Sequence, residues 1–484
     1  MKDARPATPL DAAFADLSGH RPAPSRAERR AHLKALETAM RDAAEEIAQA
    51  IDADFGGRPR PETLLTEVAM VIGGARHAAR GLRRWMRPDR VTLPAHLWPS
   101  TARVERVPLG LVGIIGPWNF PLNLVVLPAS AAFAAGNRVM IKMSEVTPRT
   151  ATLMAALAPA YFDTTELHVV TGDVDTAAAF AALPFDHLFF TGSPAVGALV
   201  QRAASANLVP VTLELGGKNP VVVAPDADLA RSASRIASAR MINGGQVCVC
   251  PDYVFVPSHR VDEFVGIVRD TLHAMFPSIV ANQDYCSAVN EANFERVVGL
   301  VEDARAKGAR VDAVAPPGEV LPDPVARKIA PTIVRGVDDS MRLADEETFG
   351  PVLTVHTYDR LDDVVDYVNA RPAPLVAYWF GPDGPDFRSF VERTRSGGVA
   401  RNDFAAQMIP SAAPFGGVGR SGMGAYHGKA GFDAFSHHRT VVGSDLPFTI
   451  TGRAAPPFGV STRVTTALTL RMARNRTRRR LRKT

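Results

Sequence analysis

The segment His187-Leu-Phe-Phe190, followed at once by Thr191-Gly-Ser-Pro-Ala-Val-Gly197, decides the fold, because an apolar strand in it runs directly into the start of a helix. Similar short apolar runs recur between helical stretches at 111–115, 138–141, 168–170 and 220–223. Strands that alternate with helices in this way predict an α/β fold with a parallel, doubly wound sheet. The connection lacks the G-x-G-x-x-G fingerprint, so taken alone it is more typical of an ordinary strand-to-helix turn than of a phosphate site.

Length and composition predict a protein of two or three domains. At 484 residues the chain is too long to fold around a single hydrophobic core. Its content of 46% apolar and 22% charged residues is ordinary for a soluble globular protein. Its three cysteines have the spacing neither of a disulfide framework nor of a structural zinc site, so we expect no metal and a reducing compartment, by default the cytoplasm. We also expect no leader peptide, because residues 1–6 lead directly into polar sequence, and no membrane span, because the low-charge run 121–141 is interrupted by prolines and a glycine.

The formal net charge of +5 arises at the end of the chain. Residues 471–484 contain seven arginines and one lysine without any acid, so the rest of the chain carries −3. Nucleic-acid binding by the core is therefore not predicted. We expect residues 458–484 to form a basic, disordered tail, for which contact with an anionic membrane or with nucleic acid is the open alternative.

Cys248 lies in the polar segment Asn243-Gly-Gly-Gln-Val-Cys-Val-Cys250, just before the apolar run 254–256. Glycines before a thiol leave room for a substrate and let peptide N–H groups point at the sulfur, which is how a nucleophile is presented. Considered singly, such a cysteine is more often a small buried hydrophobic residue. Cys250 could trap an oxidised Cys248 as a disulfide if both side chains share one face of a strand, although a packing role is the commoner explanation.

Three further stretches place polar residues where apolar runs end. Asn119 follows the run 111–116 in the proline-stiffened turn Pro117-Trp-Asn-Phe-Pro121, and its amide can donate two hydrogen bonds. Glu214 interrupts an apolar strand just before Gly216-Gly217, where a carboxylate is costly unless it is used or paired. The third stretch is Glu346-Glu-Thr-Phe-Gly-Pro351.

Together with the Cys248 segment, these stretches resemble the motifs of the aldehyde dehydrogenase superfamily, in the family's order and over residues 10–442. Shorter segments are similar to the bacterial coniferyl aldehyde dehydrogenases, relatives of the class 3 enzymes, and lie at 54–58, 183–187, 207–212, 251–253 and 414–419. The resemblance implies NAD(P)-dependent oxidation of an aldehyde, aromatic and similar to coniferyl aldehyde, to its carboxylic acid.

The resemblance also implies the roles of individual residues. Cys248 would form a thiohemiacetal and then a thioester, Asn119 and the Cys248 N–H would stabilise the oxyanion, and Glu214 would activate the hydrolytic water. Cofactor contacts would come from Trp118, Lys142, Glu145, Gly192, Ser193, Gly197, Glu347 and Phe349. Because Glu145 would repel a 2′-phosphate, NAD is favoured, while NADP stays possible. Met143 departs from the family pattern, which usually has proline after this lysine.

A three-part organisation follows from the same resemblance. We expect a Rossmann-type NAD-binding domain from residues 1–90 and 109–212, and an α/β catalytic domain from residues 213–412. Residues 91–108, with alternating apolar positions typical of a hairpin, and residues 413–457 would form a β oligomerisation arm and hence a homodimer.

Substrate choice is less well specified by the sequence. Phe404, and the absence of the histidine and two acids usual in segment 403–414, depart from the coniferyl pattern. A broad-specificity medium-chain aliphatic or aromatic aldehyde dehydrogenase is therefore an alternative. A non-catalytic scaffold or tail-directed binding protein is an alternative of another class, against which the intact Cys248, Glu214 and Asn119 argue.

Overall fold

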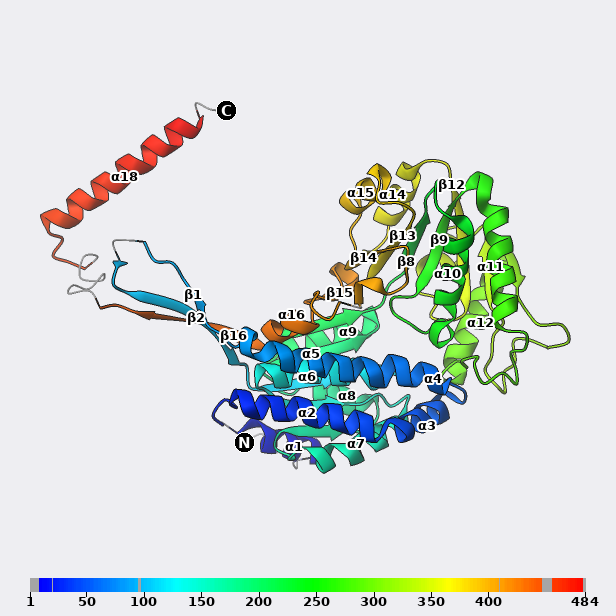
Figure 1. The fold of residues 1–484 in the computed structure, drawn as a ribbon, viewed down its shortest axis with the longest axis horizontal. Helices are drawn as coiled ribbons and strands as arrows, with labels where there is room; N and C mark the ends of the chain where they lie inside the picture. Colours follow the sequence, from blue (N-terminus) through cyan, green and yellow to red (C-terminus); the bar gives the residue numbers. More distant parts are fainter. Residues whose placement is uncertain (1–7, 20, 95–96, 409, 446–454, 482–484) are drawn as a thin grey trace, which may run out of the picture. The chain divides into compact units, whose positions relative to one another are not determined.

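The computed structural model describes residues 8–19, 21–94, 97–408, 410–445 and 455–481 (Figure 1). The chain forms two units, the first from residues 1–86 and 107–437 and the second from residues 87–106 and 438–484. The first unit contains a six-stranded and a seven-stranded sheet, whereas the second contains three strands and a helix. The predicted α/β fold class is confirmed.

The six-stranded sheet is parallel except at one edge. Its order is β15 (Gly422–Met423), β7 (Val211–Leu215), β6 (His187–Gly192), β3 (Leu111–Ile115), β4 (Arg138–Lys142) and β5 (Leu167–Val170), and only β15 runs antiparallel to its neighbour. Four of these strands lie where the sequence predicted them. Because strands β6 and β7 end at the same edge, the turn after β6 and Glu214 of β7 are brought together.

Both faces of this sheet are covered by helices, which explains why its strands are apolar almost throughout. Side chains alternate between the faces, so Val112 and Ile114 belong to one core while Leu111 and Ile115 belong to another. The first face packs against α6 (Asn123–Ala135), with α2 (Arg26–Asp42), α5 (Met70–Trp85) and α7 (Pro148–Tyr161) around it. The second face packs against α1 (Pro9–Ser18), α8 (Val174–Ala181) and α9 (Pro194–Ser205).

The N-terminal helical region is divided into several segments. Helices α2 and α3 (Ala44–Phe55) are separated at Ala43. The next helical stretch begins as α4 (Arg60–Thr63), passes through a π-helical segment η1 (Leu64–Ala69) and continues as α5. A π-helical turn is rare and changes which side chains face inward, so this segment is a candidate functional feature.

The seven-stranded sheet forms the second α/β layer of the first unit. Its order is β10 (Arg310–Ala313), β11 (Thr332–Arg335), β12 (Val352–Tyr358), β9 (Pro251–Pro257), β8 (Asn219–Val223), β13 (Val376–Phe380) and β14 (Gly398–Arg401), with only β10 antiparallel. Helices that pack on or beside it are α10 (Leu229–Met241), α11 (Val261–Met275), α12 (Glu291–Ala306), α13 (Arg342–Asp345), α14 (Leu361–Asn369) and α15 (Pro385–Arg393). Cys248 lies just before β9, the central strand of this sheet.

Three predicted domain boundaries need correction. The second sheet does not begin at residue 213, because β7 pairs with β6 through Leu215. Residues 413–437 belong to the first unit rather than to an arm: β15 pairs with β7, and α16 (Gly428–Ala434) packs on α5 and α6 through buried Phe432. Residues 87–90, expected in the cofactor domain, belong to the second unit. The rest of the predicted arm includes residues 446–454, which lie outside the described residues.

The second unit combines the predicted hairpin with the returning strand. Strands β1 (Asp89–Arg90) and β2 (Thr101–Pro108) pair antiparallel, and β16 (Ser436–Gly443) lies on the other side of β2. The tail, expected to be disordered, instead forms helix α18 (Val460–Leu481). Alanine, leucine, methionine and arginine in this segment are good helix formers, a preference that net charge alone does not reveal. Among the residues that the structure describes, no helix has both the length and the apolarity to cross a membrane.

Candidate active site

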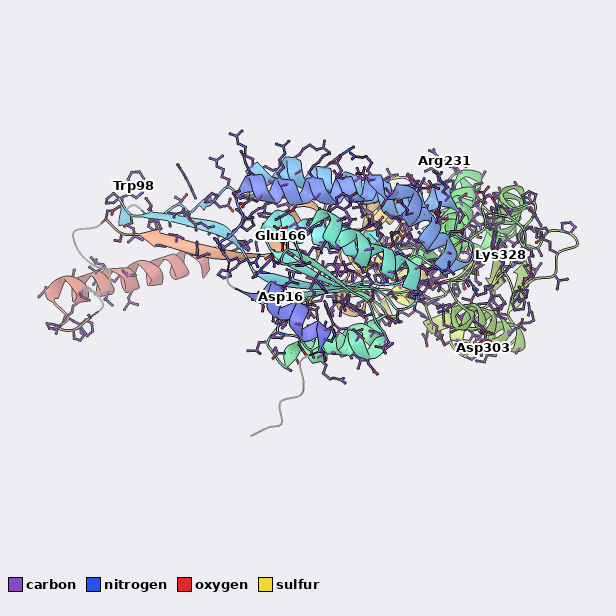
Figure 2. The ribbon with its side chains drawn as sticks, turned by 90° about the horizontal axis from the view of Figure 1, so that it is seen from below. Asp16, Trp98, Glu166, Arg231, Asp303 and Lys328 are labelled. Atoms are coloured by element: carbon purple, nitrogen blue, oxygen red, sulfur yellow. The ribbon has the colours of Figure 1, made fainter. Side chains whose placement is uncertain are left out.

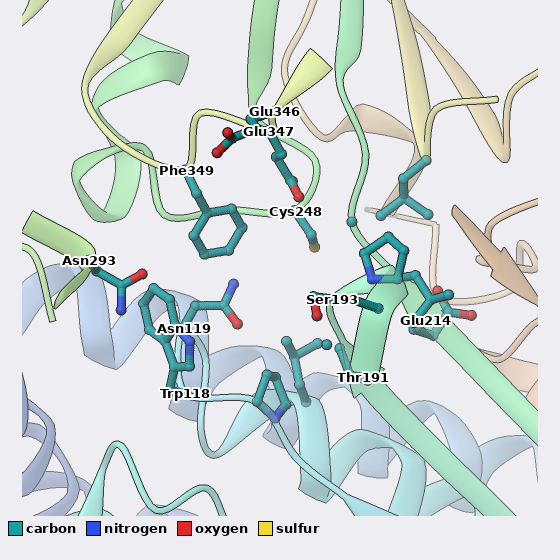
Figure 3. Close-up of a pocket in the computed structure, with 18 of the residues that line it drawn as sticks. Trp118, Asn119, Thr191, Ser193, Glu214, Cys248, Asn293, Glu346, Glu347 and Phe349 are labelled. Atoms are coloured by element: carbon teal, nitrogen blue, oxygen red, sulfur yellow. The ribbon is translucent and has the colours of Figure 1, made fainter. Parts of the chain in front are cut away.

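One cavity of about 530 Å³ brings together the three residues predicted to do the chemistry, Asn119, Glu214 and Cys248 (Figure 3). Five of the predicted cofactor contacts also line it: Trp118, Gly192, Ser193, Glu347 and Phe349. The remaining wall is largely apolar and includes Leu124, Leu375, Phe415 and Tyr426. The cavity lies between the two sheets of the first unit, because these residues come from strand ends and loops of both.

The loop before Cys248 takes a conformation that few sequences allow. Asn243, Gly244 and Gly245 follow one another with φ of 50°, 60° and 79°, in the left-handed region. At Gly245 a Cβ atom would lie 2.2 Å from the Gly350 carbonyl oxygen, so only glycine fits this contact. The non-glycine member, Asn243, is fully buried and uses its amide to donate to the carbonyls of Asn119 and Gln246, at 3.0 and 3.1 Å.

The Cys248 backbone is fixed by Asn219, at the start of β8. The Asn219 amide donates to the carbonyls of Cys248 and Cys250, at 2.8 and 3.0 Å, while its oxygen accepts from the Val376 N–H. The two neighbouring strands β8 and β13 therefore hold the thiol-bearing turn in place.

Asn119 lies in the turn after β3 and is buried, with 4% of its surface exposed. Its Nδ2 donates to the Gln246 carbonyl at 3.1 Å, and its own carbonyl accepts from Arg58 and Asn243. An amide nitrogen carries two hydrogens, so one remains for an oxygen atom in the cavity. The geometry suits a donor that stabilises a developing negative charge.

Glu214 is buried in β7, and neither of its carboxylate oxygens has a hydrogen-bond partner among the described residues. Burial raises the pKa of this carboxyl well above its ordinary value. A buried carboxylate without a partner is rare, because it loses its hydration without compensation. Its position on the wall of the cavity leaves it free to take a proton from a molecule inside.

Glu347 lies where glycine permits a close approach. A Cβ atom at Gly216 would be 2.2 Å from a Glu347 carboxylate oxygen, and the Gly217 N–H donates to that carboxylate. Burial, with a smaller contribution from Asp252, raises the pKa of Glu347 to about 8. Asp252 also holds the turn itself, because it accepts from the Thr348 N–H and hydroxyl, both at 2.9 Å.

Aromatic rings border the same end of the cavity. Trp118 and Phe349 meet edge to face with centroids 5.4 Å apart, and Phe349 has a positive φ of 46°. Arg296 donates to the carbonyls of Glu347 and Thr348, at 3.1 and 2.8 Å, and thereby fixes this turn. Sequence reasoning did not find Arg296 or Asn219, since both act through the backbone of distant residues.

The turn after β6 provides the start of helix α9. Ser193 caps the helix by accepting from the Val196 N–H, and Pro194 occupies the first helical position. Gly192 and Ser193 line the cavity, so the free N–H groups of the helix start are available to an anion such as a pyrophosphate. With Glu347 at Gly216, these residues fit a dinucleotide cofactor.

Three predicted cofactor contacts lie outside this cavity. A Cβ atom at Gly197 would be 2.7 Å from the Leu215 side chain, so this glycine serves the packing of α9 on the sheet. Lys142 ends β4, where its Nζ donates to the carbonyls of Met143 and Gly172 at 2.7 and 2.9 Å. Glu145 lies 3.7 Å from the same Nζ. Lys142 and Glu145 are therefore neighbours, outside the cavity that holds Cys248.

Cys248 and Cys250 do not share one face of a strand, which was the condition for the redox alternative. Both residues belong to a turn before β9, in which the Cys250 N–H donates to the Val247 carbonyl at 2.9 Å. The buried Cys250 thiol points to the Ala239 carbonyl of α10, at 3.5 Å. All three cysteines of the chain are free thiols. The structure therefore favours packing over a redox role for Cys250.

Comparison with known proteins identifies the family. A model described as the aldehyde dehydrogenase family matches residues 11–441. A coniferyl aldehyde dehydrogenase from Pseudomonas sp. (strain HR199 / DSM 7063) is 47% identical over 400 residues, which cover 82% of each chain. An aldehyde dehydrogenase from Craterostigma plantagineum is 36% identical over 88% of each chain.

Solved structures agree with this result. The substrate-bound state of Staphylococcus aureus AldH matches with a TM-score of 0.89 and 32% identity, over 96% of this chain and 100% of that chain. The NAD⁺ complex of an aldehyde dehydrogenase from Bacillus cereus matches with a TM-score of 0.81 and 26% identity, over 90% and 89% of the two chains.

The chain belongs to the aldehyde dehydrogenase family. It is an NAD(P)-dependent enzyme that oxidises an aldehyde, as the sequence predicted. In the described part of the chain, no group of three or more histidine, cysteine and acidic side chains is arranged to hold a metal ion.

The environment of Cys248 predicts a thiol that reacts slowly at neutral pH in the enzyme alone. Burial, and then the carboxylates of Glu347 and Glu214, raise the pKa of this thiol to about 12. Since only the thiolate is alkylated, we expect the rate of modification by iodoacetamide to rise roughly tenfold per pH unit between about pH 7 and 10. Mass spectrometry of the Cys248 peptide would measure it.

A matched variant tests the cause of this shift. Glu214→Gln removes a carboxylate that raises the pKa of the Cys248 thiol, so alkylation should be faster wherever the Glu214 carboxyl is ionised, which its raised pKa shifts toward the alkaline end of this range. A rate in the unmodified enzyme that levels off below about pH 9 would contradict the raised pKa.

Proposed function

We propose that this enzyme oxidises an aromatic aldehyde similar to coniferyl aldehyde, and that water hydrolyses the resulting Cys248 thioester to release the carboxylic acid. The observation that carries the proposal is the buried carboxylate of Glu214, which lines the same cavity as Cys248 and has no other partner among the described residues. Coniferyl aldehyde dehydrogenases at 43% to 47% identity support the substrate class.

The first step forms a bond between the Cys248 sulfur and the aldehyde carbon. The free N–H of the Asn119 amide and the Cys248 backbone N–H stabilise the negative oxygen of the thiohemiacetal, and each donor is worth about 3 to 4 kcal/mol. When bound, NAD(P)⁺ supplies the acceptor of the hydride, and Gly192, Ser193 and Glu347 would hold it. The carbonyl is then re-formed as a thioester.

Glu214 acts in the second half of the reaction. Its raised pKa makes it an effective acceptor for a proton from water, so a hydroxide equivalent attacks the thioester carbon as the Cys248 sulfur leaves. The same Asn119 amide stabilises the second oxyanion. A carboxylate already paired with an arginine would be a much weaker base.

The apolar wall supports an aromatic substrate. Leu124, Leu375, Phe415 and Tyr426 offer edges and faces for a planar ring. Phe404, which departs from the coniferyl pattern, does not line this cavity and instead stacks on Tyr378 with centroids 6.2 Å apart. The same wall also accepts an alkyl chain, which keeps a broad-specificity aldehyde dehydrogenase as the second candidate.

NAD is the preferred cofactor in this proposal. The Glu145 side chain is 40% exposed beside the buried Lys142 ammonium, so its negative charge is available to repel a 2′-phosphate. The free thiols further support a reducing compartment such as the cytoplasm.

A comparison of substrates tests the proposed class. We expect kcat/KM for coniferyl aldehyde with NAD⁺ to exceed that for hexanal by at least about tenfold, because an aromatic ring fills the apolar wall better than a flexible chain. Initial rates of NADH formation measure both values, and NADP⁺ in place of NAD⁺ should lower them. Equal values for the two aldehydes would favour the broad-specificity candidate.

Replacement of the base tests the hydrolytic route. Glu214→Gln keeps the shape of the side chain but cannot accept the proton, so one equivalent of NADH should form rapidly while the acyl-enzyme accumulates. Rapid mixing would record the burst, and mass spectrometry would find the acyl group on the Cys248 peptide. If the wild-type enzyme required coenzyme A for turnover, hydrolysis would be refuted. Absence of both burst and adduct would place Glu214 before thioester formation.

The second unit supports assembly into a homodimer. Its strands and connections leave large apolar side chains exposed, with Val91, Trp98 and Val442 at 43%, 73% and 62% exposure. Figure 2 shows Trp98 in the connection between β1 and β2. We expect sedimentation to show a dimer, whereas a stable active monomer would contradict the proposal.

The basic segment of α18 lies outside the family match, so truncation after Ala467 should leave kcat unchanged. Co-sedimentation of the full-length enzyme, but not of the truncated one, with anionic vesicles would identify membrane contact.

A further inference from the structure

Arg58 is a buried arginine that touches the active site from behind. It is 1% exposed and does not line the cavity, yet its Nη1 donates to the Asn119 carbonyl at 2.9 Å and to the Glu67 carboxylate at 3.3 Å. Its Nη2 donates to the Thr66 hydroxyl at 3.3 Å. The guanidinium thus links the backbone of Asn119 to the π-helical segment η1.

Glu67 holds the other side of the same turn. Its Oε2 accepts from the backbone N–H groups of Leu122 and Asn123, at 3.2 and 2.6 Å, while its Oε1 faces Arg58. The Asn123 amide in turn donates to the Thr66 carbonyl at 2.7 Å. The turn is therefore held at both ends: Arg58 binds the Asn119 carbonyl, and Glu67 of η1 binds the backbone N–H groups that follow it.

Glu62 connects this segment to the loop that bears the thiol. Its carboxylate accepts from the Asn243 N–H, at the first of the three left-handed residues before Cys248. The Asn243 amide donates to the Asn119 carbonyl, the same oxygen that Arg58 contacts. Residues 58–67 are therefore bonded both to the turn with the oxyanion donor and to the turn with the nucleophile.

A buried ion pair of this kind gives little net stability. Both Arg58 and Glu67 have no exposed side-chain surface, and removing two charges from water costs about as much as their attraction returns. Packing alone would be served as well by apolar residues, since Arg58 already lies against the rings of Phe55 and Phe120. The charges have a clear use only if they fix the direction of backbone groups.

We propose that Arg58, Glu62 and Glu67 are positioning residues that orient the Asn119 amide toward the oxyanion formed at Cys248. The Asn119 carbonyl carbon and the Asn119 Cβ are bonded to the same Cα, so a rotation of the backbone at this Cα moves both and would redirect the side-chain amide. The Arg58 guanidinium prevents such a rotation by holding the carbonyl, and Glu67 prevents it by holding the next N–H groups. The inference rests on the proposed oxyanion role of Asn119.

A double-mutant cycle separates positioning from a purely structural role. In full-length enzyme with NAD⁺ and coniferyl aldehyde, Arg58→Met should lower the rate of the NADH burst by about 10-fold to 100-fold, with KM for NAD⁺ nearly unchanged. In an Asn119→Ala background the same change should lower the burst less than about threefold, because the group that Arg58 orients is absent. An equal loss in both backgrounds would overturn the proposal.

Arg29 provides a matched control for the loss of a buried arginine. It is 4% exposed and donates to the carbonyls of Ala134 and Ala135, at 3.2 and 2.6 Å, without contact to residues of the cavity. Arg29→Met should lower the melting temperature as much as Arg58→Met and leave the burst rate per folded enzyme unchanged. A comparable slowing in Arg29→Met would assign the effect to general destabilisation.

A second variant keeps the test decisive if Arg58→Met fails to fold. Glu67→Gln has one carbonyl oxygen for two sets of donors, so its NH2 group must face either Arg58 or the Leu122 and Asn123 N–H groups. It should slow the burst in the wild-type background only. If Asn119→Ala alone left the burst unchanged, the proposed oxyanion role of Asn119 would be refuted. Equal losses in both backgrounds would instead refute only the positioning role of Arg58, and the result for Glu214→Gln tests only the hydrolytic step.

Discussion

The active site depends on one constraint: several buried backbone carbonyls near it receive no hydrogen bond from a neighbouring β-strand. The catalytic turns follow strand β3 and helix α10 and precede strand β9, so their carbonyl groups point into the interior without a neighbouring strand. Buried side chains supply the missing hydrogen bonds, from Asn219 to Cys248, from Arg58 and Asn243 to Asn119, and from Arg296 to the Glu347 turn. Because unpaired buried carbonyls are costly, each of these amides and guanidiniums fixes one turn in one position.

This arrangement uses Arg58 behind the cavity and Arg296 in its wall to hold backbone turns, and pairs neither cation with the acids of the cavity. Arg58 and Arg296 donate to backbone carbonyls rather than to the carboxylates of Glu214 and Glu347. Both carboxylates are buried in the wall, and together they raise the pKa of the Cys248 thiol. In their ionised form these two carboxylates favour a cationic ligand such as an oxidised nicotinamide ring, and the bound cation would in turn lower their pKa values. The same charges that restrain the thiol in the free enzyme thus suit the cofactor that the family uses.

The sequence indicated the polar side chains that meet in the cavity, but not the side chains that hold their backbone in place. Cys248, Glu214 and Asn119 stand out because each is polar where its neighbours are apolar or glycine. Arg58 and Asn219 give no such signal, since their partners are backbone atoms far along the chain. For Cys250 the sequence favoured packing, and the redox alternative fails for a local reason, because the turn before β9 breaks the alternation on which a shared strand face depends.

The domain boundary near residue 413 could not be found in the sequence either, and its position matters for specificity. Segment 413–437 looks like a connection, yet Phe415 and Tyr426 from it line the cavity, and Gly422 pairs with Glu214 across β15 and β7. At Gly417 a Cβ atom would lie 2.0 Å from the Ser421 carbonyl oxygen, so the segment folds tightly only with glycine there. One short, glycine-dependent segment therefore shapes the substrate wall and supports the strand of the proposed base. A substitution in this segment that reshapes the wall would therefore also act on the position of Glu214, the proposed base, which substitutions at Leu124 or Leu375 need not do.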